Sequence, residues 1–152
     1  MIPQPLVFLL RSYWRISRGL TLGVRGLALD EAGKVMLVRH GYVAGWHLPG
    51  GGVEHGQTAE EALAAEMAEE AGVEVKGAPE LLGVYSHHAE HKFDHVLLYR
   101  VPAWTPCAPR ARKAEIVERG FFALDALPDG ATRATCARLA EIFEGAPRSA
   151  HW

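Results

Sequence analysis

A glycine-rich turn that leads into an acidic helix is the sequence feature that most constrains how this chain folds. In the segment Pro49–Gly52 a proline is followed by three glycines, so the backbone there must turn tightly or approach another group closely. Thr58 is a favourable N-cap, and Glu61, three residues later, completes a capping box. Gly72 stands where a helix C-cap belongs. The pattern predicts a single helix over residues 58–71 that begins close to the turn.

The predicted helix is rich in carboxylates and contains no Lys or Arg. At about 100° per residue, Glu66, Glu69 and Glu70 share one edge of an α-helix. Their charges repel by about 0.2–0.5 kcal/mol per exposed pair, and a divalent cation would reverse the sign of that effect. Mg²⁺ binds oxygen ligands, through one or two carboxylates and the phosphates of a substrate. The alternative is a solvated acidic face, but the adjoining turn favours metal and phosphate, because its N–H groups suit phosphate and its carbonyls can bind a metal.

The remainder of the chain predicts mixed strands and a few helices, and therefore one layered α/β (α+β) domain. We predict that Leu22–Leu29 and Lys34–Arg39 form a hairpin around the turn at Asp30–Gly33. Further predicted elements are a loop at His40–Gly56, strands at Val73–Val75, Leu81–Tyr85, Phe93–Val101 and Ile116–Leu124, a loop at Pro102–Arg112, and a helix at Thr132–Glu144 with Cys136, Leu139, Ala140 and Phe143 on its apolar face.

Composition limits the class of protein. A length of 152 residues with 49% hydrophobic residues fits one domain with one core. The net charge of -2 argues against a stable nucleic-acid partner. Two cysteines, Cys107 and Cys136, fit neither a disulfide framework nor a paired zinc motif. No basic residue precedes the short apolar run near the start, which makes a poor signal peptide. We therefore expect a cytoplasmic protein.

The first residues predict a separate element. Leu6–Leu20 has the periodicity of a short amphipathic helix. Such a helix could pack on the domain, pack on a second subunit in a homodimer, or lie on an anionic membrane. Three arginines are few for the membrane role, so membrane binding is the least favoured. We expect a helical extension over residues 1–20, a domain over 21–145 and a tail over 146–152.

The segment Gly51–Val73, with the sequence GGVEHGQTAEEALAAEMAEEAGV, resembles the Nudix box. The flanks are similar to the family as well, at Trp46–Gly51 and at Glu118–Pro128, which reads ERGFFALDALP. The resemblance covers about Thr21 to Pro128. The positions that match the box in register are Gly51, Glu66, Met67, Glu69, Glu70, Gly72 and Val73.

Two box positions depart from the family pattern. Gln57 stands in place of the first glutamate, and Ala65 in place of the arginine that typically orients the glutamates through an ion pair. Loss of both charges is milder than loss of one, because one alone would leave an unpaired, partly buried charge. We expect the fold to survive. A catalytically weak or inactive Nudix-fold module that binds a nucleotide or protein partner is the alternative to an enzyme.

The resemblance implies an α/β/α sandwich with a mixed sheet. It also implies an Mg²⁺-dependent hydrolase, with Mn²⁺ as the alternative ion, that cleaves a nucleoside diphosphate linked to another moiety. By the same resemblance the metal ligands would be the Gly50 carbonyl, Glu66 and Glu70, with Glu69 assisting. The general base would be Glu66 or Glu69, or a later residue for which Glu115 is the first candidate and Glu118 the second.

Contacts to a small nucleotide-type substrate are predicted in the loop before the box. Tyr42, Trp46 and His47 could stack on a base, although aromatic loop residues often serve packing instead. Arg39 could pair with phosphate or simply be solvated. The backbone of Gly51 and Gly52 could approach the substrate closely. A second polar segment holds His87, His88, His91 and His95, for which a polar loop is favoured over a zinc site.

Overall fold

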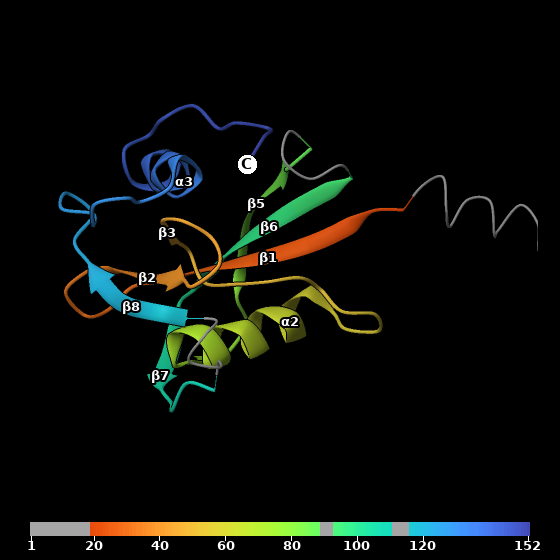
Figure 1. The fold of residues 1–152 in the computed structure, drawn as a ribbon, viewed down its shortest axis with the longest axis horizontal. Coiled ribbons are helices and arrows are strands. Elements are labelled where there is room, and N and C mark those ends of the chain that lie inside the picture. Colours follow the sequence, from red (N-terminus) through yellow and green to blue (C-terminus); the bar gives the residue numbers. More distant parts are fainter. Residues whose placement is uncertain (1–18, 89–92, 111–115) are drawn as a thin grey trace, which may run out of the picture.

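The computed structural model describes residues 19–88, 93–110 and 116–152, in which the strands lie between two helical segments (Figure 1). The predicted mixed α+β class is confirmed. The elements in chain order are β1 (Thr21–Ala28), β2 (Val35–His40), β3 (Trp46–His47), α2 (Ala59–Glu66), the π-helix η1 (Met67–Ala71), β4 (Val73–Lys76), β5 (Glu80–Ser86), β6 (Asp94–Val101), β7 (Ala103–Pro106), β8 (Ile116–Phe122) and α3 (Arg133–Phe143).

The predicted hairpin between β1 and β2 is wrong. β1 pairs in parallel with β6, which in turn pairs with β5, whereas β2 pairs antiparallel with β3 and β8. The turn itself forms, since Asp30 Oδ1 accepts hydrogen bonds from the N–H groups of Ala32 (2.9 Å) and Lys34 (2.8 Å). Beyond it the strands meet at an isolated bridge between Leu29 and Val35 and then diverge. They diverge because both edges of β1 are already hydrogen-bonded, one to β6 and the other to the glycine turn.

A hydrophobic core lies on each side of the strands, and β1 contributes to both. Val24 belongs to the cluster that packs under α2 with Leu63 and Met67, while Leu27 belongs to the cluster beneath α3. Gly26 allows the close approach of helix and strand: a Cβ atom there would lie 2.3 Å from Sδ of Met67. This contact sets the acidic helix directly against β1.

The acidic helix begins as predicted and ends differently. Its capping box is confirmed: Thr58 Oγ1 accepts from Glu61 N–H (3.2 Å), and Glu61 Oε2 accepts from Thr58 N–H (2.8 Å). Gly72 is the left-handed C-cap, with φ of 68°. The last five residues, however, form a π-helix rather than the α-helix that local propensity predicts. A π-helix is wider than an α-helix, so each residue turns by less than 100°.

Two further predictions are corrected by long-range contacts. The predicted loop at Pro102–Arg112 contains β7, which pairs antiparallel with β4, and its prolines stand beside and at the end of that strand. In α3, Cys136 and Phe143 are exposed, whereas Arg138 is buried. Three partners explain this. The Arg138 guanidinium lies 4.3 Å from the Tyr85 ring centre and 5.7 Å from that of Trp152, and it bonds Glu141 Oε1 at 2.6 Å.

Some sequence predictions fall outside the residues that the structure describes. These are most of the predicted N-terminal helix, Glu115 and His91. Within the described ranges, the helices are too short or too polar to cross a membrane.

Candidate active site

The glycine turn is hydrogen-bonded to the edge of β1 that does not face β6. Gly26 N–H donates to Pro49 O (2.9 Å), Val24 N–H donates to Gly51 O (2.9 Å), and the chain continues to a bond between Val53 N–H and Leu22 O (2.8 Å). The turn is thus held to β1 by backbone hydrogen bonds, which fix the positions of its carbonyl and N–H groups.

Gly50 is required at the centre of this turn. Its φ is +147°, and a Cβ atom there would lie 2.0 Å from the carbonyl oxygen of Val24. Backbone cannot yield as a side chain can, so another residue would displace the turn from β1.

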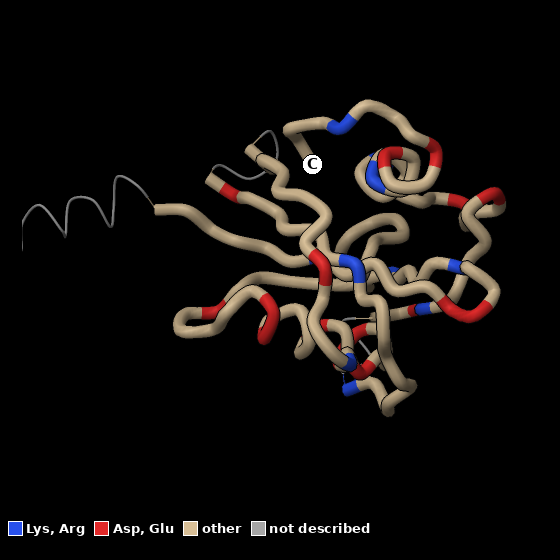
Figure 2. Tube along the Cα trace, turned by 180° about the vertical axis from the view of Figure 1, so that it is seen from behind, with Lys and Arg blue, Asp and Glu red and all other residues tan. Residues whose placement is uncertain are grey.

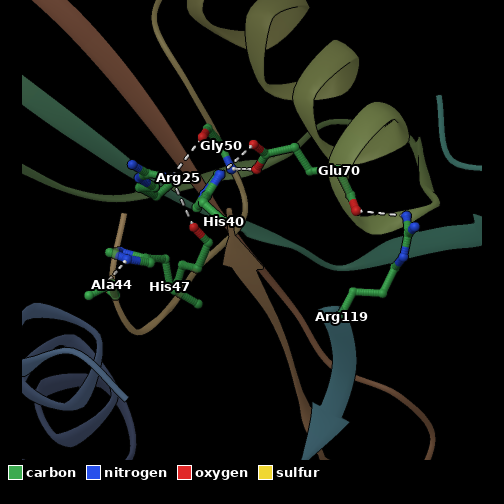
Figure 3. Close-up of polar contacts among 8 residues, drawn as sticks. Arg25, His40, Ala44, His47, Gly50, Glu70 and Arg119 are labelled. Atoms are coloured by element: carbon green, nitrogen blue, oxygen red, sulfur yellow. Dashed lines mark hydrogen bonds and ion pairs between the residues drawn. The ribbon is translucent and has the colours of Figure 1, made fainter. Parts of the chain in front are cut away.

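Two glutamates of the acidic helix reach this turn. The buried Glu70 accepts the Gly50 N–H at Oε2, at 2.9 Å (Figure 3). The Glu66 carboxylate packs on Gly51, where a Cβ atom would lie 2.3 Å from its Oε1. Glu69 is exposed instead. The smaller rotation per residue in the π-helix explains this division, because it brings Glu70 closer in line with Glu66 and turns Glu69 away.

Arg25, on β1, lies on the other side of the turn and was not predicted from the sequence. Its Nη1 donates to the carbonyl oxygens of Gly50 (2.7 Å) and Leu48 (3.1 Å). Burial lowers the pKa of Arg25, and the negative charges of Glu70 and Glu66 oppose that shift. One sequence feature could have indicated Arg25: it is the single charged residue in an otherwise uncharged strand, TLGVRGLA.

His40, at the end of β2, also borders the site and was missed. It is buried, and its Nδ1 lies 3.6 Å from Oε1 of Glu70. Burial, and then the charges of Arg25 and His47, lower the pKa of His40 to about 4. The imidazole is therefore neutral at neutral pH, so it does not cancel the charge of Glu70.

Of the two box departures, Gln57 has a defined hydrogen bond, and Ala65 leaves the helix without the family's arginine. Gln57 Oε1 accepts the Glu54 N–H at 3.0 Å, and so closes the turn before the helix. No Lys or Arg stands on the helix itself. Figure 2 shows where the acidic and basic residues of the described chain lie. At the far end of the helix, Arg119 of β8 donates from Nη1 to the main-chain oxygen of Glu70 at 2.9 Å. The helix end is therefore supported from another strand.

The predicted substrate residues separate into two groups. Tyr42 is 71% exposed and lines a hollow of about 310 Å³ formed by residues 39–45. The rings of Tyr42 and His47 lie 5.3 and 5.6 Å from the ring of His40, which connects this hollow to Glu70.

The second group is engaged in packing. The Trp46 ring lies 4.8 Å from that of Phe122, and the Arg39 guanidinium lies 5.9 Å from the Trp46 ring centre. Arg39 also forms an ion pair with Glu118, with Nε 2.7 Å from Oε2. Both side chains of this ion pair are partly exposed, so a substrate phosphate could still compete with Glu118 for Arg39.

The oxygen atoms at the turn suit a hard divalent cation. Glu66, Glu70 and the Gly50 carbonyl supply two carboxylates and one backbone oxygen, which matches the ligands that Mg²⁺ takes before water and phosphate complete its shell. In the described part of the chain, no three His, Cys, Asp or Glu side chains gather as a metal-binding group. Of the histidine segment, His87 pairs with Asp94, with Nδ1 3.2 Å from Oδ2.

The chain is similar to known proteins over most of its length. The NUDIX domain family model matches residues 19–141. A MutT-like protein of Streptomyces ambofaciens is 36% identical over 67 residues, which are 44% of this chain and 43% of that protein. The chain therefore matches less than half the length of that curated relative.

Two solved structures resemble the fold. A MutT NUDIX hydrolase from Burkholderia pseudomallei superposes with a TM-score of 0.69 at 25% identity, over 80% of this chain and 97% of that one. An ADP-ribose pyrophosphatase from Streptococcus suis superposes with a TM-score of 0.54 at 27% identity, over 87% and 95% of the two chains.

Proposed function

The chain belongs to the NUDIX domain family, and from that membership we propose that it hydrolyses a diphosphate linkage in a nucleoside diphosphate joined to another moiety. The observation that carries the proposal is the meeting of Glu66 and Glu70 at the glycine turn, one carboxylate against Gly51 and the other bonded to Gly50 N–H. The similarity to a MutT NUDIX hydrolase, which extends over nearly all of that protein, supports it.

The residues that would hold Mg²⁺, or Mn²⁺, are Glu66, Glu70 and Gly50 through its carbonyl. A divalent ion at this place neutralises diphosphate oxygens and lowers the pKa of a bound water. The protein fixes the positions of these oxygens. The acidic helix, with its π-helical end, holds the carboxylates, and the hydrogen bonds to β1 hold the glycine turn. Glu69 is exposed beside them and is our candidate to accept the proton of the attacking water, with Glu66 as the alternative. Glu115 remains a sequence prediction for that role.

We place the nucleoside part of the substrate at the hollow formed by residues 39–45. Tyr42 offers an exposed ring for stacking, and His40 and His47 line the way from this ring to Glu70. Gly52 has open space at its Cβ position, so its backbone can approach phosphate. The hollow accepts a small nucleotide-type ligand, and the identity of the second moiety is what a substrate panel would determine.

The test is a metal-dependent screen of the purified chain against nucleoside triphosphates, ADP-ribose and nucleotide sugars. We expect turnover with Mg²⁺ or Mn²⁺ and its loss with a chelator. Glu66→Gln and Glu70→Gln should each lower turnover by about 10²-fold or more with the fold intact. Glu60→Gln is the matched control, because Glu60 is an exposed glutamate at the start of the same helix.

Two outcomes would contradict this function. Equal turnover in Glu70→Gln and in the unmodified chain would place the reaction elsewhere. No product from any nucleotide, together with ligand binding that ignores the chelator, would instead support the alternative of a binding module.

A further inference from the structure

The acidic helix carries no positive charge of its own beside the carboxylates at the glycine turn. The helix residues 59–71 include no Lys or Arg, yet Glu70 is buried and Glu66 is partly buried. Carboxylates in such positions repel each other more strongly than they would in water, because the surroundings screen them less.

Arg25, in contrast, is a cation whose hydrogen bonds, among the described residues, reach no anionic group. Its guanidinium is charged at every accessible pH, and both hydrogen-bond acceptors recorded for it are neutral carbonyls, of Leu48 and Gly50. Arg25 is partly buried, and a cation withdrawn from water without a counter-charge is unfavourable. The negative charges that act most strongly on Arg25 are those of Glu70 and Glu66, in that order.

The backbone of Gly50 joins the two sides. Its carbonyl accepts from Arg25 at 2.7 Å, while its N–H donates to Glu70 at 2.9 Å (Figure 3). We propose that Arg25 is a positioning residue that serves as the resident counter-cation of Glu66 and Glu70 and holds the Gly50 carbonyl in place before a divalent ion binds.

This inference rests on the proposed function, because it makes Arg25 and the metal two cations that share one set of oxygens. Repulsion between a single and a double positive charge a few ångströms apart exceeds the net contribution of a hydrogen bond. Removal of the guanidinium should therefore destabilise the metal-free protein and strengthen its binding of metal. A guanidinium that only braced the turn would affect both forms equally.

The experiment compares unmodified protein, Arg25→Met and Arg25→Lys by thermal unfolding and by titration with Mn²⁺. In a chelator, we expect the Tm of Arg25→Met to fall by about 5 °C or more. In saturating Mn²⁺ most of that loss should be recovered, with a Kd for Mn²⁺ lower by about tenfold, since ligand binding to the folded state raises its stability. Arg25→Lys keeps the charge, so its Mn²⁺ affinity should stay near that of the unmodified chain.

Arg138→Met is the matched control, since it removes a buried guanidinium that lies on α3 and bonds Glu141. It should lower the Tm and leave the Mn²⁺-induced shift unchanged. If Arg25→Met folds only with Mn²⁺ present, its unfolding on chelation would support the proposal as well.

Failure of the proposed role of Arg25 can be distinguished from failure of the proposed function. A Mn²⁺ shift in the unmodified protein with an equal or smaller shift in Arg25→Met would overturn the role of Arg25 alone. The absence of any Mn²⁺ binding by all the variants would overturn the proposed function together with this inference.

Discussion

The backbone N–H of Gly50 donates to Oε2 of Glu70 at 2.9 Å, across 20 residues of sequence. This bond fastens the end of the acidic helix to the glycine turn, and the turn is in turn hydrogen-bonded to β1. The position of the Glu70 carboxylate is thus set by β1, through the turn, rather than by its own helix. Changes to the turn should therefore alter the chemistry of the site.

Substitutions at Gly50 and Gly51 should therefore have different effects, the first mainly on stability and the second mainly on turnover. Gly50→Ala should destabilise the fold by about 3 kcal/mol, because its Cβ would collide with the main chain of Val24 at a φ that L-residues rarely adopt. Gly51→Ala should cost less than about 1 kcal/mol, since it meets only the flexible end of Glu66, but should lower turnover by about 10²-fold. Urea unfolding and steady-state kinetics on both variants measure this contrast. Equal effects on stability would contradict it.

The stability of the metal-free protein should depend on pH through His40. Its pKa is about 4 when folded, against 6.5 unfolded, so the unfolded chain takes up the proton first as the pH falls. The free energy of unfolding is therefore not reduced by His40 above pH 6.5. It falls progressively between pH 6.5 and about pH 4, by up to about 3 kcal/mol.

The check for this pH dependence is urea unfolding in a chelator from pH 7.5 to pH 4. The difference between the unmodified protein and His40→Gln isolates His40 from the carboxylates that titrate in the same range. Parallel curves for the two proteins would show that His40 does not titrate as its burial requires.

Tyr42 should contribute to substrate binding and not to the chemical step. Tyr42→Ala removes an exposed ring at the mouth of the hollow, and base–aromatic stacking contributes about 1–3 kcal/mol. We expect KM to rise about tenfold with kcat within a factor of two, the signature of lost uniform binding. Tyr42→Phe keeps the ring and should retain the original KM. A fall in kcat with KM unchanged would move Tyr42 out of the binding role.

Restoration of the two box charges, by Gln57→Glu with Ala65→Arg, should change turnover by less than about threefold. Gln57 already closes its turn through Glu54 N–H, and a glutamate could accept the same bond. Under the proposal above, Arg25 already serves as the cation for these carboxylates, from its place against the Gly50 carbonyl. Kinetics of the double variant beside each single variant test this. A tenfold gain would mean that the native site is poorly supported and that the resident arginine is insufficient.

Short-range features were predictable because they depend on neighbours in the chain. The capping box at Thr58 and Glu61, the C-cap at Gly72 and the turn at Asp30 all join residues at most a few positions apart, and all of them form. The resemblance that pointed to Glu66, Glu69 and Glu70 is also a pattern of spacing, and two of these side chains, Glu66 and Glu70, meet the glycine turn. A helix and two of its acidic residues could therefore be placed beside a glycine turn from the sequence alone.

Long-range competition decided the rest. The two hydrogen-bonding edges of β1 were taken by β6 and by the glycine turn, which left β2 to pair elsewhere. The π-helix, which separates Glu69 from Glu70, ends where Arg119 arrives from β8.

The supporting side chains of the site follow the same rule. Arg25 and His40 are ordinary strand residues by local pattern. They become part of the site only because packing places Arg25 against the Gly50 carbonyl and buries His40 beside Glu70. Sequence determined which groups could carry charge and turn the chain, because those are local properties. Tertiary structure determined which charges face one another, because burial and strand pairing join residues that the sequence keeps far apart.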